Sequence, residues 1–331
     1  MVKTLVLGDI HISNKDAGLR CAQEKCIKKI YDKVKPDEVI QLGDFLDFRK
    51  PSPEALLTAK SIIDYWQKKS SVVILRGNHC ASTKADNGVT ALSVFDSQNV
   101  RIVTHTFVDK LNKRVYIPHY ENEEKITEVL STCDSSYTIF GHFGYYGCLN
   151  SVGDHDFNIN ITSFRNNCVL GHIHRQNERT FMSGGEQKSI LILGTPYTIN
   201  FGETEKKNYF AVIEDSEITL HEIKHGPRHL VVKNDQVQAQ KKKINNKKYY
   251  TFLRVLLGAG ETQANIDDIT VPFLDIKFIP AFDEETLSNY KPSRDLFRLN
   301  EVVIQDYIEA ANSSIDKDKL MEGYNLLKYE D

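Results

Sequence analysis

The stretch Leu5-Val6-Leu7-Gly8-Asp9-Ile10-His11 joins a short apolar run to two polar side chains. A continuous run of Val and Leu is typical of a strand buried in a parallel sheet, and ligands of open α/β sheets bind beyond the carboxyl ends of such strands. Asp9 and His11 follow this strand, so they are placed to face a shared site. One Asp-x-His pair is weak support, because most such pairs are solvated loop residues. The interpretation therefore depends on whether the pattern recurs.

The same pattern recurs after two further predicted strands. Hydrophobic periodicity and proline positions predict alternating elements: helix 16–34, strand 38–42, helix 54–68 and strand 72–75. The second strand ends at Gly43-Asp44, with Asp47 close behind, and the third ends at Gly77-Asn78-His79. A β-α-β-α-β order with short loops implies parallel strands with right-handed connections. The three strand ends are therefore predicted to lie at one edge of a sheet.

Downstream, the pattern continues and adds histidines. We predict strands at 100–103, 114–117, 137–140, 168–170 and 189–193, a helix at 121–132, and a hairpin of strands at 209–213 and 217–222. Two of these strands end in Gly141-His142 and Gly171-His172-Ile173-His174. The remaining histidines are expected to be ordinary surface or capping residues: His105, His119, His155, His221, His225 and His229.

After residue 228 the pattern changes. We predict a first domain over 1–228, a small α/β cap over 229–295 and C-terminal helices over 296–331. The lysines of this region could neutralise phosphates of a ligand, although a solvated loop explains them equally well: Lys241, Lys242, Lys243, Lys247 and Lys248. The C-terminal helices could form a partner surface or simply pack on the cap, and their candidate partner contacts are Val302, Val303, Tyr307, Ile308, Leu326 and Leu327.

The amino-acid composition limits the classes of protein to which the chain can belong. Apolar residues make up 40% and charged residues 26% of 331 residues, as in ordinary globular proteins, and the formal net charge of −3 excludes overall basicity as an argument for nucleic-acid binding. No signal peptide or membrane span is predicted, and the six scattered cysteines read as reduced thiols. We therefore expect a protein of the bacterial or host-cell cytoplasm that does not bind membranes.

The side chains collected at the strand ends suit a metal centre: Asp9, His11, Asp44, Asn78, His142, His172 and His174. Carboxylate, amide and imidazole ligands together suit Mn(II), Fe(II) or Zn(II) better than Ca(II), which takes oxygen ligands. Seven ligands are too many for one ion but suit two ions that share a carboxylate. Such pairs, about 3.5–4 Å apart, catalyse in-line phosphoryl displacement by water. No protein nucleophile is then needed, and the sequence has no nucleophile elbow, Walker A loop or Rossmann fingerprint.

Five motifs resemble those of the calcineurin-like metallophosphoesterases in order and spacing: Asp9-x-His11, Gly43-Asp44-x-x-Asp47, Gly77-Asn78-His79, Gly141-His142 and Gly171-His172-x-His174. The resemblance implies a two-sheet α/β sandwich with flanking helices. The ligand sets that it implies share one residue: Asp9, His11, Asp44 and His174 for one metal, and Asp44, Asn78, His142 and His172 for the other. It also implies that His79 is the catalytic histidine, which protonates the leaving oxygen.

Within this superfamily, three stretches resemble the SbcD-type nucleases of double-strand-break repair: 43–53, 117–120 and 194–197. That resemblance implies a homodimer with Mn(II)-dependent double-strand exonuclease and single-strand endonuclease activity, for which Mg(II) is the other metal to consider. It implies roles in DNA recombination, replication and repair. It further implies that the cap contacts DNA and that the C-terminal helices dock on an SMC-like ATPase of the SbcC type.

The chain departs from the family pattern at two positions. Cys80 stands where an aspartate usually follows Gly-Asn-His, and Asp47 stands where some members carry a second active-site histidine. Asp47 is therefore either catalytic or a carboxylate that supports the ligands. Two other functions also remain open: hydrolysis of a small phosphodiester or a phosphoprotein, and DNA-end binding by a scaffold without activity.

Overall fold

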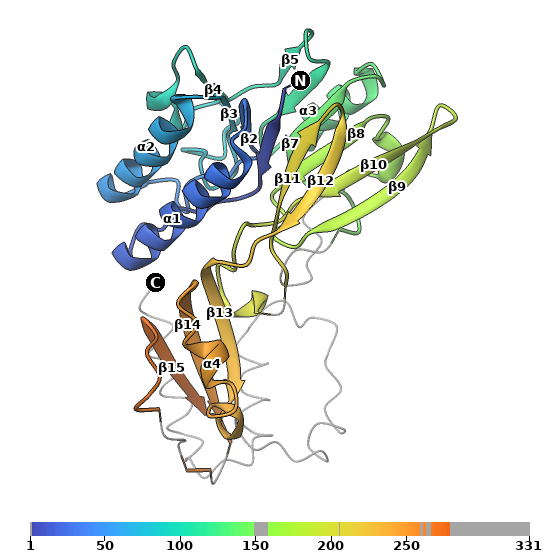
Figure 1. Cartoon of the computed structure of the whole chain (residues 1–331). Helices are drawn as coiled ribbons and strands as arrows, with labels where there is room; N and C mark the ends of the chain where they lie inside the picture. Colours follow the sequence, from blue (N-terminus) through green and yellow to red (C-terminus); the bar gives the residue numbers. More distant parts are fainter. Residues whose placement is uncertain (1, 149–157, 205, 259–260, 263–265, 279–331) are drawn as a thin grey trace, which may run out of the picture. The chain divides into compact units, whose positions relative to one another are not determined.

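The computed structural model describes residues 2–148, 158–204, 206–258, 261–262 and 266–278. Two six-stranded sheets form the main body, and a three-stranded sheet follows later in the chain (Figure 1). The fold is a mixed α/β architecture with two multi-stranded sheets, as predicted.

The first sheet contains the strands that carry the first three motifs. Its strand order is β12 (Glu217–Glu222), β11 (Tyr209–Glu214), β1 (Thr4–Leu7), β2 (Glu38–Gln41), β3 (Ser71–Leu75) and β4 (Val100–Val103). Strands β1 to β4 are parallel, and Leu7 pairs with Gln41 at the end where the motifs begin. The predicted parallel order is confirmed, so the ends of β1, β2 and β3 lie at one edge of the sheet.

The second sheet carries the two histidine motifs. Its order is β5 (Phe107–Asp109), β6 (Arg114–Ile117), β7 (Thr138–His142), β8 (Asn167–Gly171), β10 (Glu186–Ile192) and β9 (Asn177–Ser183). Strands β6, β7, β8 and β10 are parallel, whereas β5 and β9 are antiparallel edge strands that the sequence pattern did not predict. Strand β9 is polar along most of its length, which hides it from a search for apolar runs.

Alternation along the strands divides the core into three layers. The residues that point between the sheets include Val6, Ile40 and Val73 from the first sheet and Phe140 and Val169 from the second, and they form one buried cluster. Their sequence neighbours point outward, towards the helices. The two sheets therefore pack face to face as a sandwich.

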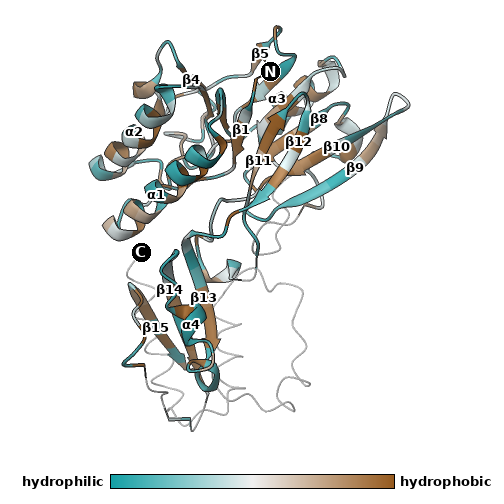
Figure 2. Cartoon of the chain, viewed as in Figure 1, coloured by the Kyte–Doolittle hydropathy of each residue, from teal (hydrophilic) through white to brown (hydrophobic). Residues whose placement is uncertain are grey.

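Helices cover the outer face of each sheet. Helices α1 (Ala17–Val34) and α2 (Pro53–Gln67) lie side by side on the first sheet, and their amphipathic character is visible as brown and teal stripes (Figure 2). Both begin at side-chain caps, because Asp16 accepts from the Leu19 amide and Ser52 from the Ala55 amide. Helix α3 (Glu123–Thr132) packs Ile126 and Leu130 on the second sheet.

The third sheet has the order β13 (Gly226–Lys233), β14 (Tyr249–Leu257) and β15 (Phe273–Phe278), and the short helix α4 (Lys241–Ile244) lies between β13 and β14 in the sequence. Short 3-10 helices occur at Ala91–Phe95, Ile161–Ser163, Phe201–Glu203 and Asn234–Gln236. The larger compact unit comprises Met1–Val231, Gln240–Arg254 and Asp268–Leu274, and the smaller one Val232–Ala239, Val255–Asp267 and Asp275–Asp331. The predicted domain boundaries at 228 and 295 stay predictions, and the predicted C-terminal helices lie outside the described residues.

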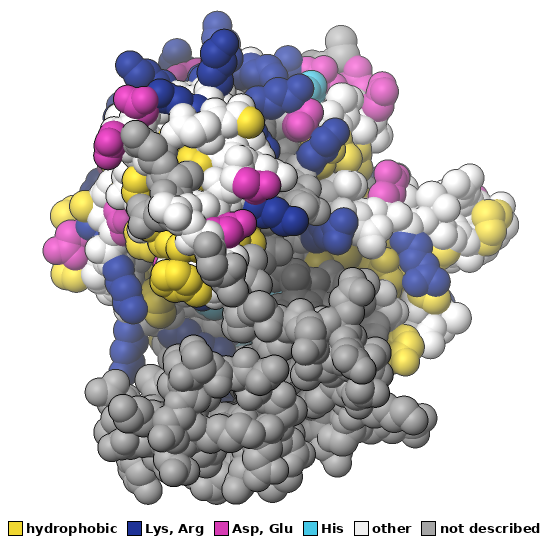
Figure 3. Space-filling view, turned by 90° about the horizontal axis from the view of Figure 1, so that it is seen from below, with side chains coloured by type: hydrophobic (Ala, Val, Ile, Leu, Met, Phe, Trp, Pro, Cys, Tyr) yellow, Lys and Arg dark blue, Asp and Glu magenta, His cyan; other side chains and the backbone are white. Residues whose placement is uncertain are grey.

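No helix in the described part of the chain is long and apolar enough to cross a membrane. The face shown in Figure 3 carries Lys and Arg side chains interspersed with Asp and Glu side chains over its described part. Charge of both signs is thus mixed on this face, in keeping with a formal net charge of only −3.

Candidate metal centre

Both sheets deliver side chains to one place. Strands β1, β2 and β3 end just before Asp9, Asp44 and Asn78, while β7 ends at His142 and β8 leads into His172. All seven predicted metal ligands are brought together, in groups whose ligand atoms lie within 4.8 Å of one another or hydrogen-bond to a member of such a group.

The backbone around the ligands is unusual. His11, Asp44 and His172 have φ values of 48°, 47° and 80°, in the left-handed region that side chains other than glycine seldom adopt. The glycines beside them make room for this geometry: a Cβ at Gly43 would overlap the His142 ring, and one at Gly77 would overlap the Asp44 carboxylate. The recurring Gly of the motifs therefore serves close approach between neighbouring ligand loops.

The first group comprises Asp9, His11 and His174. The Nε2 atoms of His11 and His174 are 3.2 Å apart, and an Asp9 oxygen lies 3.9 Å from His174 Nε2. Asp44 Oδ2 lies 3.9 Å from His11 Nε2, so this carboxylate reaches the group from its other side. Four donor atoms thus surround one small volume.

The second group comprises Asp44, His142 and His172, with Asn78 at its centre. Asn78 Oδ1 lies 3.0 Å from His142 Nε2 and 2.9 Å from His172 Nδ1, and these two nitrogens are 3.3 Å apart. Asp44 Oδ2 is 3.4 Å from His142 Nε2. The same carboxylate oxygen therefore belongs to both groups.

The hydrogen bonds around the two ligand groups show that the nitrogen lone pairs of His142 and His174 face the other ligands. His142 Nδ1 is 2.7 Å from the Leu42 carbonyl oxygen, which only accepts, so Nδ1 carries a hydrogen and the neutral ring has its lone pair on Nε2. His174 Nδ1 likewise donates to Glu203 Oε1 at 3.0 Å, which leaves its Nε2 lone pair facing His11. Metal-binding histidines are oriented in this way by partners on their other nitrogen. The donor set fits two divalent cations that share Asp44.

Charge leads to the same conclusion. Asp9 and Asp44 are almost fully buried, and no Lys or Arg of the described chain pairs with either. Burial raises the pKa of Asp9 to about 6, against the effect of His142. Burial alone would lower the pKa of His142, but Asp44 and Asp9 raise it to about 9. The two carboxylates thus draw positive charge into the site, and a metal ion can take the place of that proton.

His79 belongs to a third group with His11 and Asp44, whose ligand atoms also lie within 4.8 Å of one another. Its Nδ1 is 2.7 Å from the Asp47 carbonyl oxygen, so Nδ1 carries a hydrogen and Nε2 is the atom that can exchange a proton. Its backbone amide donates to Asp44 Oδ1 at 2.8 Å, and its ring contacts the His11 ring edge-on with centroids 4.9 Å apart. The catalytic histidine implied by the sequence is therefore fixed to the shared carboxylate.

The Asp47 side chain lies beside a predicted ligand, His11. Its Oδ1 lies 3.4 Å from His11 Nδ1, whereas His79 is contacted by the Asp47 backbone and not by its carboxylate. The carboxylate lies at ion-pair distance from His11 Nδ1 but makes no hydrogen bond to it, so both roles of Asp47 stay predictions. Cys80 is not suited to act as a nucleophile, because its buried thiol accepts from the Leu46 amide and burial raises its pKa to about 12.

Two side chains at the site, Glu203 and His119, were not predicted from the sequence. Glu203 accepts from His174 but lies 29 residues further along the chain, with no motif to mark it. His119 was predicted to be an ordinary surface or capping residue, and this is wrong: it is buried and stacks on His172 with centroids 5.8 Å apart. It follows β6, which is parallel to β7, so its position at a strand end was the available signal. His229 is buried as well, against Thr198.

The Glu203 carboxylate is expected to support both stability and metal binding. It is buried, pairs with Lys206 at 2.6 Å and accepts from the Ile199 amide at 2.9 Å. We expect Glu203→Ala to lower the free energy of unfolding by about 3 kcal/mol, because it leaves a buried ammonium unpaired. It should also weaken metal affinity about 10- to 100-fold through His174, whereas Glu203→Gln, which keeps an acceptor, should weaken it less. Urea unfolding and metal titration measure the two effects.

The same carboxylate predicts a pH dependence. Burial alone would raise its pKa, but His174 and Lys206 lower it from 4.5 to about 2. Its contribution is therefore fully present above pH 4.5 and is lost as the pH falls towards 2. With metal removed by a chelator, the difference in free energy of unfolding between the native chain and Glu203→Gln should shrink as the pH falls from 4.5 towards 2. A constant difference would show that the Glu203 charge does not stabilise the fold.

The remaining predicted residues do not gather at this centre. Lys241 pairs with Asp268 at 2.5 Å, and Lys242 and Lys243 are exposed on α4. Lys247 and Lys248 precede β14 and line a separate pocket. The six predicted partner contacts, Val302, Val303, Tyr307, Ile308, Leu326 and Leu327, lie outside the described residues.

Comparison with known proteins gives one family. The sequence profile of the calcineurin-like phosphoesterases matches residues 2–181. No curated protein matches the chain. Among solved structures, the nuclease MPE of Pseudomonas putida is similar with a TM-score of 0.32 and 15% identity, over 66% of this chain and 87% of that one.

Proposed function

Because the chain belongs to the calcineurin-like phosphoesterase family, we propose that its paired-cation centre hydrolyses phosphodiester bonds of DNA. The observation that carries this proposal is the pair of ligand groups joined by one Asp44 oxygen. Two divalent cations in these groups would activate water and neutralise charge on the scissile phosphate. Mn(II) suits the mixed imidazole and oxygen donors, and Mg(II) is the alternative.

The chain's own residues would orient the substrate and move one proton. His79 Nε2 would donate to the leaving oxygen, since Nδ1 is held by the Asp47 carbonyl. Asp47 and Glu203 would keep the His11 and His174 rings in their binding orientations. No Ser or Cys nucleophile is required, which agrees with the buried, high-pKa thiol of Cys80.

DNA as substrate is supported by the motifs shared with SbcD-type nucleases. By that resemblance we propose double-strand exonuclease and single-strand endonuclease activity in DNA repair, recombination and replication. A homodimer and an SMC-like ATPase partner of the SbcC type belong to the same proposal. The segment proposed to bind the ATPase is 296–331.

The test compares substrates and metals. The full chain would be incubated with linear double-stranded DNA, single-stranded DNA and bis(p-nitrophenyl) phosphate, each with Mn(II), Mg(II) or EDTA. We expect cleavage of all three with Mn(II) and none in EDTA. Turnover of the small diester without DNA cleavage would overturn DNA as the substrate but keep the diesterase chemistry. DNA binding without turnover of any substrate would indicate a scaffold.

A further inference from the structure

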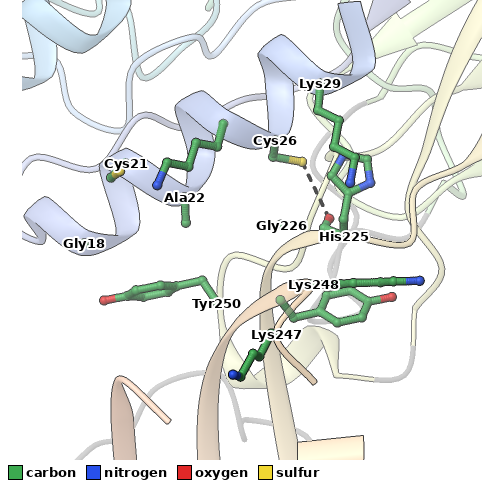
Figure 4. Close-up of a pocket in the computed structure, with 12 residues that line it drawn as sticks. Gly18, Cys21, Ala22, Cys26, Lys29, His225, Gly226, Lys247, Lys248 and Tyr250 are labelled. Atoms are coloured by element: carbon green, nitrogen blue, oxygen red, sulfur yellow. Dashed lines mark hydrogen bonds between the residues drawn. The ribbon is translucent and has the colours of Figure 1, made fainter. Parts of the chain in front are cut away.

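A second site lies along helix α1, outside the metal centre. It is a pocket of about 580 Å³, and all of its lining residues belong to the larger compact unit. One wall is a stripe of α1 that includes Cys21, Lys25 and Lys29, and the other is formed around Lys247 and Tyr250 (Figure 4). Residues three or four apart share a helix face, so the α1 wall is one continuous surface.

The pocket is cationic. Four lysines line it, Lys25 and Lys29 from α1 and Lys247 and Lys248 from the segment before β14, and no acidic residue lines it. Within the described part of the chain, no carboxylate lies within ion-pair distance of any of the four; Lys28, on another face of α1, pairs with Glu24 at 2.6 Å. Four unpaired ammonium groups around one concave surface favour an anionic ligand.

The pocket is built by close packing. A Cβ at Gly18 would overlap the Tyr250 hydroxyl, and one at Gly226 would overlap the Cys26 thiol. The Gly226 amide donates to the Lys248 carbonyl at 3.1 Å, and the Cys26 thiol lies 3.6 Å from the His225 carbonyl (Figure 4). These contacts hold the two walls together, so all four lysines line one pocket without a ligand.

The pocket begins close to the metal centre. Tyr250 Oη lies 3.5 Å from Asp16 Oδ1 at the start of α1, only five residues after the predicted ligand His11. Gln23, about two turns further along α1, donates to the His11 carbonyl at 2.7 Å. The α1 stripe then runs on to Lys29, and eleven residues of helix from Gly18 span about 16 Å. The phosphates of a strand that leads away from the metal centre could lie along this length of α1.

We propose that this lysine pocket binds the phosphate backbone of a DNA strand next to the metal centre, an inference that rests on the proposed function. The four ammonium groups would contact successive phosphates without regard to sequence. The Tyr250 ring would provide an aromatic surface for an unstacked base. The sequence had pointed to Lys247 and Lys248 as members of a lysine cluster with Lys241, but the pocket joins them to Lys25 and Lys29 instead.

The test removes each wall separately. Lys25→Ala/Lys29→Ala changes the α1 wall, and Lys247→Ala/Lys248→Ala changes the other; exposed Lys→Ala changes in a helix are well tolerated. Each double variant of the full chain should bind single-stranded DNA, in EDTA, about tenfold or more weakly, and its salt slope should fall by about 1.4. Hydrolysis of bis(p-nitrophenyl) phosphate with Mn(II) should stay unchanged.

The matched control is Lys68→Ala/Lys69→Ala. These exposed lysines follow the last residue of α2, just before β3 begins, at the opposite edge of the sheet from the metal centre. They change the net charge equally, so an equal loss of DNA affinity would overturn the pocket. A wild-type affinity of the Lys25→Ala/Lys29→Ala variant would overturn it too. If the native chain turns over the small diester but neither binds nor cleaves DNA, the proposed function itself fails.

Cysteine alkylation gives an independent measurement. Cys21 is exposed and lines the pocket, whereas Cys133 is partly exposed at the end of α3 and does not line it. Saturating single-stranded DNA should slow alkylation of Cys21 about tenfold and leave that of Cys133 unchanged, as measured by mass spectrometry of the native chain. Equal rates at Cys21 with and without DNA would contradict strand binding in the pocket.

Discussion

Asp44→Asn is expected to lower kcat for a small phosphodiester by about 10³-fold or more, a loss of about 4 kcal/mol of transition-state stabilisation. The same Asp44 oxygen lies 3.9 Å from His11 Nε2 and 3.4 Å from His142 Nε2, so one substitution weakens both ligand groups. An amide oxygen is neutral and binds divalent cations more weakly than a carboxylate. Metal titration should therefore show fewer than two ions bound per chain at concentrations that saturate the native protein.

Stability separates this effect from unfolding. Burial alone would raise the pKa of Asp44, but His142 holds it well below its usual value, so the neutral replacement should lower the free energy of unfolding in EDTA by about 3 kcal/mol. Saturating Mn(II) should stabilise the native chain by about 3 kcal/mol per bound ion at one hundred times the dissociation constant, and the variant by much less. The matched control is Asp47→Asn, which touches one ligand only and should cost about tenfold in kcat. Equal losses in both variants would contradict a shared carboxylate.

The sequence predicted most of this centre because strand ends obey a simple rule. A buried parallel strand is recognisable from its apolar run, and the residues that follow it lie at one edge of the sheet whatever the loops do. That rule predicts from the sequence alone that Asp9, Asp44 and Asn78 lie close together. No local sequence pattern shows that β7 and β8 pack against the first sheet. The prediction that the second sheet contributes to the same site therefore depended on the family resemblance.

Features that depend on tertiary packing could not be predicted. Glu203 acts on His174 through a loop whose path no propensity determines, and β9 pairs with β10 although its side chains are mostly polar. The lysine pocket is the clearest instance. In the sequence Lys25 is one of several lysines in the predicted helix 16–34, and only the packing of Gly18 against Tyr250 shows that it shares a pocket with Lys247.

His79→Asn is expected to lower kcat about 10²- to 10⁴-fold for DNA but much less for bis(p-nitrophenyl) phosphate. The difference follows from the leaving group: a deoxyribose oxygen departs as a strong base and needs a proton, whereas p-nitrophenolate departs without one. His79 Nε2 is the proton donor in this argument, because Nδ1 is bound to the Asp47 carbonyl.

A structural role would give another result. The His79 amide anchors Asp44 through the backbone, and that bond survives the substitution, so metal content and stability should stay at native values. If His79 only shaped the ligand groups, both substrates would slow equally and metal would be lost. A loss confined to the substrate with the poor leaving group, at full metal occupancy, assigns proton transfer to His79 itself, because no change in phosphate binding or cation charge distinguishes the two esters in this way.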